Sequence, residues 1–358
     1  MRSLLDPVQR NVTAARLRLA ALLEGRPRLA YVGGHGFQNL GDDALFEAAR
    51  QELDGFHLAT FRYPPQEVRL ARLGLSGSRY FQQFILGGGT FINPYGLPVA
   101  RTALQQGLPA WTLGTGVGSA GFNMSSRPDL TEWRALLRDF RAVGVRGPYS
   151  KAALDALGVS RAEVIGDLAL VFAQAAPTPV THPRRFAVNI TVPPPEEPEG
   201  YPYERLEGLE RATRHLMAQG WTPVFVAMHS NDYEPMRRLM AAVGRPEEPL
   251  HTPGRAREYL ELVGPCTLTL AVRLHAAVLS CCAGTPVLSM GYREKCLDFM
   301  ASLGLEAWHV DLATPEGDIF ERALALSEQA DGLRTTVLAR AREKQRGIRD
   351  YVRKLLSA

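Results

Sequence analysis

Short apolar runs rich in β-branched and aromatic residues recur along the chain, and segments with helical periodicity separate many of them. The runs predict buried strands, and the segments between them predict helices. Strands are predicted at residues 29–32, 80–86, 111–113, 142–146, 163–167, 185–190, 222–228, 267–272 and 287–290, and helices at residues 3–24, 44–53, 149–157, 203–219, 276–283 and 318–356. This alternation indicates parallel sheets with helices on both faces.

One segment rich in proline and polar residues, at 174–183, interrupts the alternation. Its composition is typical of a connection between domains, and a chain of 358 residues is long enough for two. We therefore predict an α/β fold with two Rossmann-like, doubly wound domains. The predicted divisions are an N-terminal domain at 1–176, a linker at 177–184, a C-terminal domain at 185–330, and a C-terminal helix at 331–358 that returns to the first domain.

The charge balance argues against nucleic acid as a partner. The 41 basic and 37 acidic residues leave a formal net charge of +4, without the dense basic face that nucleic-acid binding requires. The four cysteines form no Cys-x-x-Cys pair, and neither a signal peptide nor a membrane-spanning run is recognised. The sequence therefore predicts a reduced, cytoplasmic protein.

The helix predicted at 3–24 is amphipathic, with arginines among its polar positions. We favour packing of its apolar stripe on the flank of the first domain. The alternative is a peripheral contact with the inner face of the membrane, because basic amphipathic helices can bind lipid surfaces.

Glycine-rich segments follow three strands of the first half. The first of them, residues 33–43, lies between a strand and a helix, a layout that brings backbone N–H groups close to a ligand. Asp42 and Asp43 fall at this helix start, where one carboxylate can cap the helix and the other can face the cleft. Glycines at 87–89 and 114–118 repeat the pattern and allow close approach of the backbone.

Arg273, Leu274 and His275 lie where a buried strand ends and a helix of small residues begins. In an open α/β sheet, ligands bind at this edge. The N–H groups and dipole of the helix start favour an anion, and an arginine there can bind phosphate or carboxylate through two hydrogen bonds. The structural alternative is that Arg273 forms an ion pair and that His275 packs against the sheet.

In their order along the chain, these motifs resemble the polysaccharide pyruvyl transferase family over about Tyr31 to Leu305. The matching positions are 38–42, 87–89, 114–118, Val145-Arg146 with Ser150, Gly166-Asp167, 273–276, 284–286 and 292–295. The chain departs from the family at Gly147, where an acid often follows the arginine, and at 33–35, where aromatic residues are usual. These departures bear on the acceptor substrate more than on the fold.

The resemblance implies two domains that face each other across a cleft, as in GT-B glycosyltransferases. It also implies transfer of pyruvate from phosphoenolpyruvate onto two hydroxyls of a sugar, in a cell-surface polysaccharide or its lipid-linked precursor. The products are a pyruvate ketal and phosphate. Phosphoenolpyruvate is then a co-substrate, and no cofactor is expected.

The donor in this reaction carries a carboxylate and a phosphate, so its site needs several cations. Arg146, Arg273 and Lys295 come from strand ends or from the loops after them. The other predicted substrate-binding residues are Asn39, Gly41, Gly88, Gly89 and Leu274.

Ketal formation also needs proton transfers, for which His275, Asp42 and Asp43 are the candidate catalytic residues. A helix N-terminus disfavours protonated histidine and a bound dianion favours it, so we expect His275 to become an acid only when the donor is bound. No Asp-x-Asp motif occurs and the histidines lack metal-ligand spacing, so no metal is predicted.

Two other interpretations stay open. A GT-B-like glycosyltransferase that uses a nucleotide sugar is one, because the glycine loops and helix starts would bind a diphosphate equally well. A non-catalytic glycan-binding relative of the same fold is the other. The sequence determines neither the acceptor sugar, nor the hydroxyls that react, nor which candidate is acid or base, nor the oligomeric state.

Overall fold

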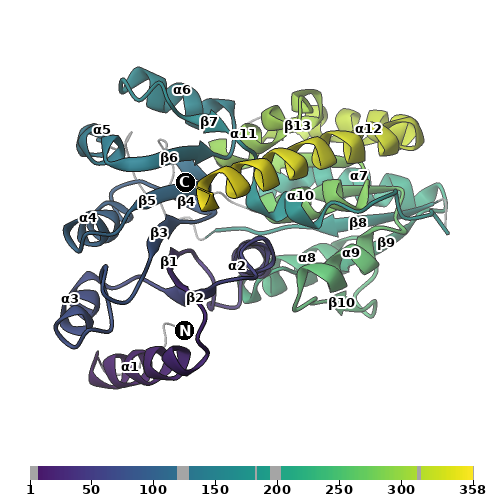
Figure 1. The fold of residues 1–358 in the computed structure, drawn as a ribbon. Coiled ribbons are helices and arrows are strands. Elements are labelled where there is room, and N and C mark those ends of the chain that lie inside the picture. Colours follow the sequence, from purple (N-terminus) through teal and green to yellow (C-terminus); the bar gives the residue numbers. More distant parts are fainter. Residues whose placement is uncertain (1–6, 119–128, 182–183, 194–202, 313–315, 358) are drawn as a thin grey trace.

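A computed structural model describes residues 7–118, 129–181, 184–193, 203–312 and 316–357. It contains two sheets, each with helices on both faces, and every described strand pair is parallel (Figure 1). The predicted α/β class with two doubly wound domains is confirmed.

The first sheet has the strand order β2-β1-β3-β5-β6-β7, and β4 pairs with β5. Its strands are β1 (Arg28–Val32), β2 (His57–Thr60), β3 (Gln83–Leu86), β4 (Gly89–Ile92), β5 (Ala110–Val117), β6 (Phe140–Val145) and β7 (Glu163–Val164). Because the order reverses at β1, the loops after β1 and β3 diverge to opposite faces and leave room for a ligand between them.

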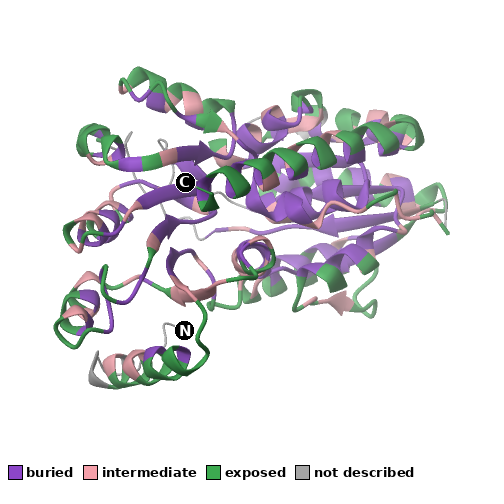
Figure 2. Ribbon diagram, in the orientation of Figure 1, coloured by how far each residue is buried: buried purple, intermediate pink, exposed green. Residues whose placement is uncertain are grey.

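The second sheet has the order β10-β9-β8-β11-β12-β13, so its own reversal point lies between β8 and β11. Its strands are β8 (Arg185–Asn189), β9 (Thr222–Val226), β10 (Leu250–His251), β11 (Leu268–Ala271), β12 (Val287–Gly291) and β13 (His309–Asp311). The strands of both sheets are largely buried, as Figure 2 shows in purple.

Three apolar clusters hold the layers together. One fills the outer face of the first sheet, one fills the outer face of the second, and the third runs beneath both sheets and joins the domains.

The helices are α1 (Pro7–Leu23), α2 (Leu40–Glu52), α3 (Pro64–Arg72), α4 (Leu97–Gln105), α5 (Thr131–Arg138), α6 (Pro148–Ala156), α7 (Glu207–Ala218), α8 (Tyr233–Ala242), α9 (Ala256–Val263), α10 (Leu274–Ala283), α11 (Glu294–Ser302) and α12 (Glu316–Leu356), with 3₁₀ turns η1 (Leu168–Phe172), η2 (Tyr203–Leu206), η3 (Ser230–Asp232) and η4 (Glu306–Trp308).

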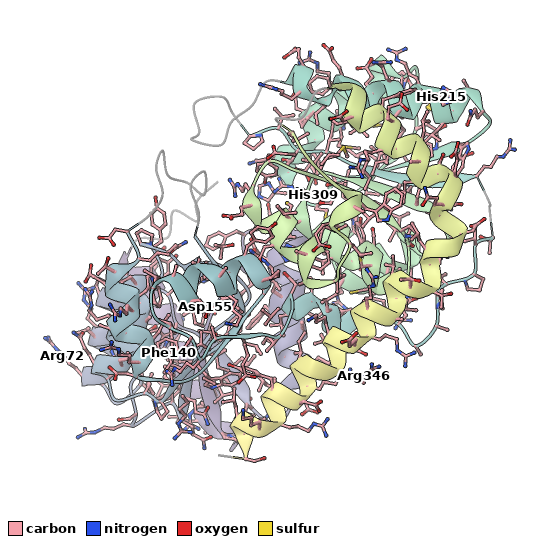
Figure 3. The ribbon with its side chains drawn as sticks, turned by 90° about the horizontal axis from the view of Figure 1, so that it is seen from above. Arg72, Phe140, Asp155, His215, His309 and Arg346 are labelled. Atoms are coloured by element: carbon pink, nitrogen blue, oxygen red, sulfur yellow. The ribbon has the colours of Figure 1, made fainter. Side chains whose placement is uncertain are left out.

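Helix α12 is 41 residues long and contacts both domains. Arg334 donates hydrogen bonds from its guanidinium to the carbonyls of Cys266 and Gly264 in the second domain. Seventeen residues later, Tyr351 donates to the carbonyl of Thr112 in β5, at 3.0 Å. Figure 3 shows this helix in yellow, running from the second domain to the first.

The start of α2 differs from the prediction. The helix predicted at 44–53 begins at Leu40, because the side chain of Asn39 accepts a hydrogen bond from the Gly41 N–H at 3.1 Å and caps the helix. Asp42 therefore lies in the first turn, and the suggestion that it caps this helix is wrong. The glycines at 87–89 also lead into a strand, β4, and not only into a loop.

Helix α1 packs on the first domain through Arg18 and Ala21 and, from its predicted apolar stripe, through Ala15. Arg18 is buried and pairs with Glu67 at 2.8 Å, whereas Val12 and Leu19 are 45% and 51% exposed. The expectation that the stripe packs on the flank is wrong at these two positions.

Contact of helix α1 with a membrane surface stays a prediction. Among the described helices, none is long and apolar enough to cross a membrane.

The prolines and acids of residues 192–202 predict an exposed loop, and residues 194–202 of this segment lie outside the described part of the chain.

Candidate active site

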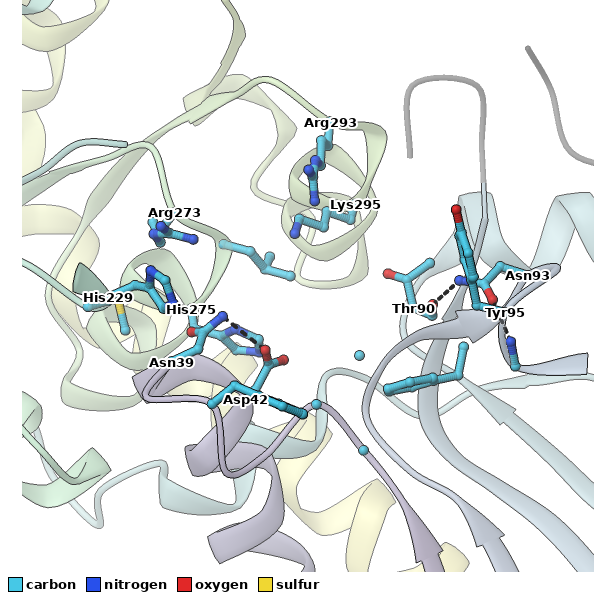
Figure 4. Close-up of a pocket in the computed structure, with 18 of the residues that line it drawn as sticks. Asn39, Asp42, Thr90, Asn93, Tyr95, His229, Arg273, His275, Arg293 and Lys295 are labelled. Atoms are coloured by element: carbon cyan, nitrogen blue, oxygen red, sulfur yellow. Dashed lines mark hydrogen bonds between the residues drawn. The ribbon is translucent and has the colours of Figure 1, made fainter. Parts of the chain in front are cut away.

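A cavity of about 610 Å³ lies between the two domains. Its walls come from residues that follow β1, β2, β6, β8, β9, β11 and β12, together with β4 and the residues after it. The carboxyl ends of the strands in both sheets therefore face the same space, which is where open α/β sheets bind ligands. Figure 4 shows residues of the second domain on one side of this cavity and Thr90, Asn93 and Tyr95 of the first domain across from them.

The lining of the cavity has more basic than acidic side chains. Among the described residues that line it, Asp42 is the only acid. The basic residues of the lining are Arg62, Arg146, Arg273, Arg293 and Lys295. An excess of cations in a partly buried cavity favours an anionic ligand, because charges interact more strongly away from bulk water.

Arg273 directly precedes α10, and Asp232, which is fully buried, holds its side chain. The Nε atom lies 2.8 Å from one carboxylate oxygen and 3.0 Å from the other, and Nη2 adds a contact of 2.5 Å. Asn189, at the end of β8, accepts a hydrogen bond from the backbone N–H of Arg273 at 3.1 Å. The ion pair that was the structural alternative for Arg273 is therefore formed, with Asp232 as the partner. The pair also fixes the guanidinium at the edge of the cavity.

His275 lies on Gly41, the second residue of α2, so the helix starts of the two domains meet at this point. A Cβ atom on Gly41 would overlap the imidazole ring. Beside this contact, the backbone N–H of Leu40 donates to the carbonyl of Met228 at 2.9 Å across the domain boundary. Gly41 therefore allows the close approach that places His275 in the cavity wall.

Burial, together with the nearby charges of Lys295, Arg146 and Arg273, lowers the pKa of His275 to about 3. The ring is therefore neutral at neutral pH in the donor-free protein. The sequence predicts a neutral ring from the helix start alone. In the structure, burial and the three cations are the causes.

Asp42 and Lys295 face the same space from opposite domains. Burial raises the pKa of Asp42, while Lys295 and Arg273 lower it, and Asn39 donates to its carboxylate at 2.9 Å. Burial also lowers the pKa of Lys295 to about 7, with Arg293 contributing in the same direction. Lys295 can thus gain or lose a proton near neutral pH.

Arg146 connects the cavity to a buried contact between the domains. It is 1% exposed, and its Nε lies 3.5 Å from a carboxylate oxygen of Asp298 in α11. Asp298 also accepts hydrogen bonds from the N–H groups of Tyr149 and Ser150 and from the Ser150 hydroxyl, so it caps α6 from the other domain. A Cβ atom on Gly147 would overlap Asp298, which explains the glycine at this position.

The structure brings most of the residues predicted for the site into one place. Those that line the cavity are Asn39, Asp42, Gly89, Arg146, Arg273, Leu274, His275 and Lys295. Gly41 lies behind His275. Like Gly41, two others are outside the lining: Asp43 accepts a hydrogen bond from the Gly36 N–H at 2.7 Å, and Gly88 packs closely on Leu45. In this structure Asp43 and Gly88 support the loops around the cavity. The catalytic role of Asp43 and the substrate-binding role of Gly88 stay predictions.

Several lining residues were not predicted, among them Arg62, His229 and Arg293. Each lies within three residues of the end of a parallel strand. This shared position could have identified them as lining residues from the sequence. Among the described residues, no group of three His, Cys, Asp or Glu side chains is placed to hold a metal ion.

Solved structures with the same architecture cover nearly the whole chain. Anabaena HepE in complex with UDP-glucose has a TM-score of 0.58 and 12% identity, over 92% of this chain and 99% of that one. The UDP-GlcNAc 2-epimerase of Methanocaldococcus jannaschii has a TM-score of 0.52 and 10% identity, over 84% and 91%. The spinosyn rhamnosyltransferase SpnG has a TM-score of 0.53 and 13% identity, over 93% and 100%.

At these identities the similarity establishes the fold alone: two parallel-sheet domains of the GT-B type with a cleft between them. None of the curated protein sequences is significantly similar to this chain. The family model for polysaccharide pyruvyl transferase matches residues 39–294, which is more than half of the chain. The protein belongs to this family and is a transferase of polysaccharide biosynthesis.

Proposed function

We propose that the enzyme transfers pyruvate from phosphoenolpyruvate onto two hydroxyls of a sugar in a cell-surface polysaccharide or its lipid-linked precursor. The observation that carries the proposal is the lining of the cavity, where the described residues include five basic side chains and one acidic side chain. Phosphoenolpyruvate presents a carboxylate and a phosphate close together, and guanidinium groups bind both in a planar, two-point geometry. Arg273, Arg146 and Lys295 are the proposed donor-binding residues.

The atoms and protons of this reaction balance as follows. A proton is added to the CH₂ carbon of the donor, two sugar oxygens bond to its C2 atom, and the bond from C2 to the phosphate oxygen breaks. Of the two hydroxyl protons released, one replaces the proton given to the methyl group and the other leaves with phosphate. His275 is the proposed acid for the first step, and Asp42, with its raised pKa, is the proposed base for a sugar hydroxyl.

The first-domain wall supports a sugar acceptor opposite the donor. Phe37, Tyr63 and Tyr95 line the cavity and are 46%, 41% and 65% exposed. Exposed aromatic rings offer flat apolar surfaces with a polar edge, which suit the face of a pyranose ring. Tyr95 stands across the cavity from Lys295 (Figure 4), so an acceptor on this wall would face a donor held by the second domain.

A glycosyltransferase that uses a nucleotide sugar is the second candidate. The HepE structure of the same fold contains UDP-glucose, and the cations of this cavity would also attract a diphosphate. The two candidates differ in the donor consumed and the product released.

We expect the purified enzyme to release inorganic phosphate from phosphoenolpyruvate when a panel of free and lipid-linked sugar acceptors is supplied. Phosphate release should continue in the presence of a chelator, since no metal is expected in the reaction. Parallel reactions with UDP-sugars serve as the comparison. Turnover of a nucleotide sugar, with none of phosphoenolpyruvate, would establish the second candidate.

Donor affinity is expected to fall as the pH rises above about 7. The pKa of Lys295 is lowered to about 7 mainly by burial, so the donor-free enzyme loses this positive charge above neutral pH. An anionic donor stabilises the ammonium form, so binding at pH 8 should take up protons. Calorimetric titrations in two buffers of different ionisation enthalpy measure both effects.

Lys295→Arg is the matched control for this measurement, because arginine stays protonated across the same range. In that variant the decline in affinity between pH 7 and pH 8.5 should largely disappear. Equal donor affinity of the wild-type enzyme at pH 6 and pH 8.5 would exclude a titrating Lys295 from the donor site.

A further inference from the structure

Two buried polar atoms face each other where the two domains meet. Nε2 of His275, in α10 of the second domain, lies 3.8 Å from Oδ2 of Asp167, which precedes η1 in the first domain. Within the described part of the chain, neither atom has a hydrogen-bond partner. An unpartnered polar atom costs free energy when it is buried, and such atoms in native proteins are rare. Two of them at this separation are placed to pair with each other.

The carboxyl of Asp167 is held by its other oxygen. Oδ1 accepts a hydrogen bond from the N–H of Ala169 at 3.0 Å and caps η1. An asparagine would cap this turn equally well. The cap therefore explains the position of the side chain but not the second carboxylate oxygen, which is directed toward His275.

The two ring nitrogens of His275 have different surroundings. Nε2 is buried beside Asp167, and His275 also lines the cavity. Nδ1 packs on Gly41 and, unlike Nε2, is not a fully buried atom without a partner. A carboxylate that accepts the hydrogen of Nε2 would leave Nδ1 to exchange a proton with a ligand.

The charged groups that act most strongly on this pair come from both domains. The groups acting on His275 are Lys295, Arg146 and Arg273, and those acting on Asp167 are Arg146, Asp42 and Asp298, with Tyr31 and Cys282 also close to its carboxyl. Burial raises the pKa of Asp167 to about 6, while Arg146 lowers it. At pH 8 the carboxyl is therefore ionised and can accept a hydrogen bond.

We propose that Asp167 is the positioning residue for His275: its carboxylate accepts the Nε2 hydrogen and keeps Nδ1 directed to the donor. A closure of about 1 Å would bring the two atoms to an ordinary hydrogen-bond distance. The identity of the donor in this proposal rests on the proposed function; the pairing of the two side chains does not.

The pairing gives the proton a defined path. A bound anionic donor offsets the three cations around His275, so the ring takes up a proton on Nδ1 while Nε2–H stays bonded to Asp167. The Nδ1 proton passes to the CH₂ carbon of the donor, and the ring returns to its neutral form with hydrogen on Nε2. A proton from the first sugar hydroxyl then restores Nδ1.

Asp167→Asn tests the proposal, since the amide oxygen keeps the cap of η1 and the carboxylate is lost. We expect kcat to fall by roughly 10–100-fold, the range for losing a residue that orients a functional side chain, while the Kd of phosphoenolpyruvate changes little. Asp155→Asn, at an exposed carboxylate of α6 (Figure 3), removes the same charge from the first domain and should leave kcat unchanged.

A measurement on the wild-type enzyme avoids dependence on the variant. Imidazole ¹⁵N chemical shifts at pH 8, with the His275 signal assigned by its absence in His275→Gln, report which nitrogen carries the hydrogen. We expect hydrogen on Nε2 in the wild-type enzyme and a loss of this preference in Asp167→Asn.

The outcomes separate the two proposals. Hydrogen on Nδ1 of wild-type His275, or a near-normal kcat in Asp167→Asn, would overturn the role of Asp167. Hydrogen on Nε2 together with no turnover of phosphoenolpyruvate would leave the pairing in place and reject the donor.

Discussion

Replacement of His275 by alanine is expected to lower kcat by roughly 10²–10⁴-fold, the range for removing a general acid–base group. The ring is neutral in the donor-free enzyme, because burial and three nearby cations lower its pKa to about 3. Its main interaction is therefore expected in the transition state, so kcat and kcat/KM should fall together. Steady-state kinetics and calorimetric donor binding measure the two effects separately.

His215→Ala is the control for this variant, because His215 lies in α7 of the second domain and does not line the cavity (Figure 3). Its kcat should match that of the wild-type enzyme. A near-normal kcat in His275→Ala would mean that the histidine only packs between the domains, and Asp42 would become the leading candidate for the acid.

Replacement of Arg273 by alanine is expected to reduce both stability and donor binding. The guanidinium neutralises Asp232, whose side chain is fully buried, so its removal leaves an uncompensated charge and should cost about 3–5 kcal/mol. The donor loses a fork of N–H groups at the same time, and lysine should not restore it, because a point charge cannot copy the fork. Urea denaturation and calorimetric titration with phosphoenolpyruvate give the two quantities.

The double variant Arg273→Met/Asp232→Asn separates these roles. Removing both charges should restore much of the stability, since a buried pair can often be replaced by neutral groups with little loss. Donor binding should stay weak. Recovery of donor affinity along with stability would show that Arg273 acts only through the fold.

The central strands were predictable because parallel strands buried on both faces form continuous apolar runs. Phe84 to Leu86 and Phe186 to Val188 are such runs. The strands that were missed, β2, β10 and β13, lie at sheet edges and are short and partly exposed, so they carry no apolar run. Strand β4 was missed because its glycines are typical of a turn.

Much of the candidate site was predictable for a related reason. Residues after parallel strands gather at one edge of a sheet, so Arg146 and Arg273 could be expected at the cleft without knowledge of side-chain contacts. The contacts across the domain boundary could not be expected in this way. The approach of His275 to Asp167, and of Arg146 to Asp298, depends on how the domains dock, and no local pattern encodes that.

Helix α12 has a consequence for the order in which the chain can fold during translation. Tyr351 and Val352 belong to the apolar cluster that also contains Trp111 and Ile165 of the first domain. At 5–20 residues per second, a ribosome needs roughly 10–40 s to travel from residue 165 to residue 351. The first domain therefore waits through the synthesis of the whole second domain before its core can close. During that interval a nascent-chain chaperone would find an open apolar surface beneath the first sheet.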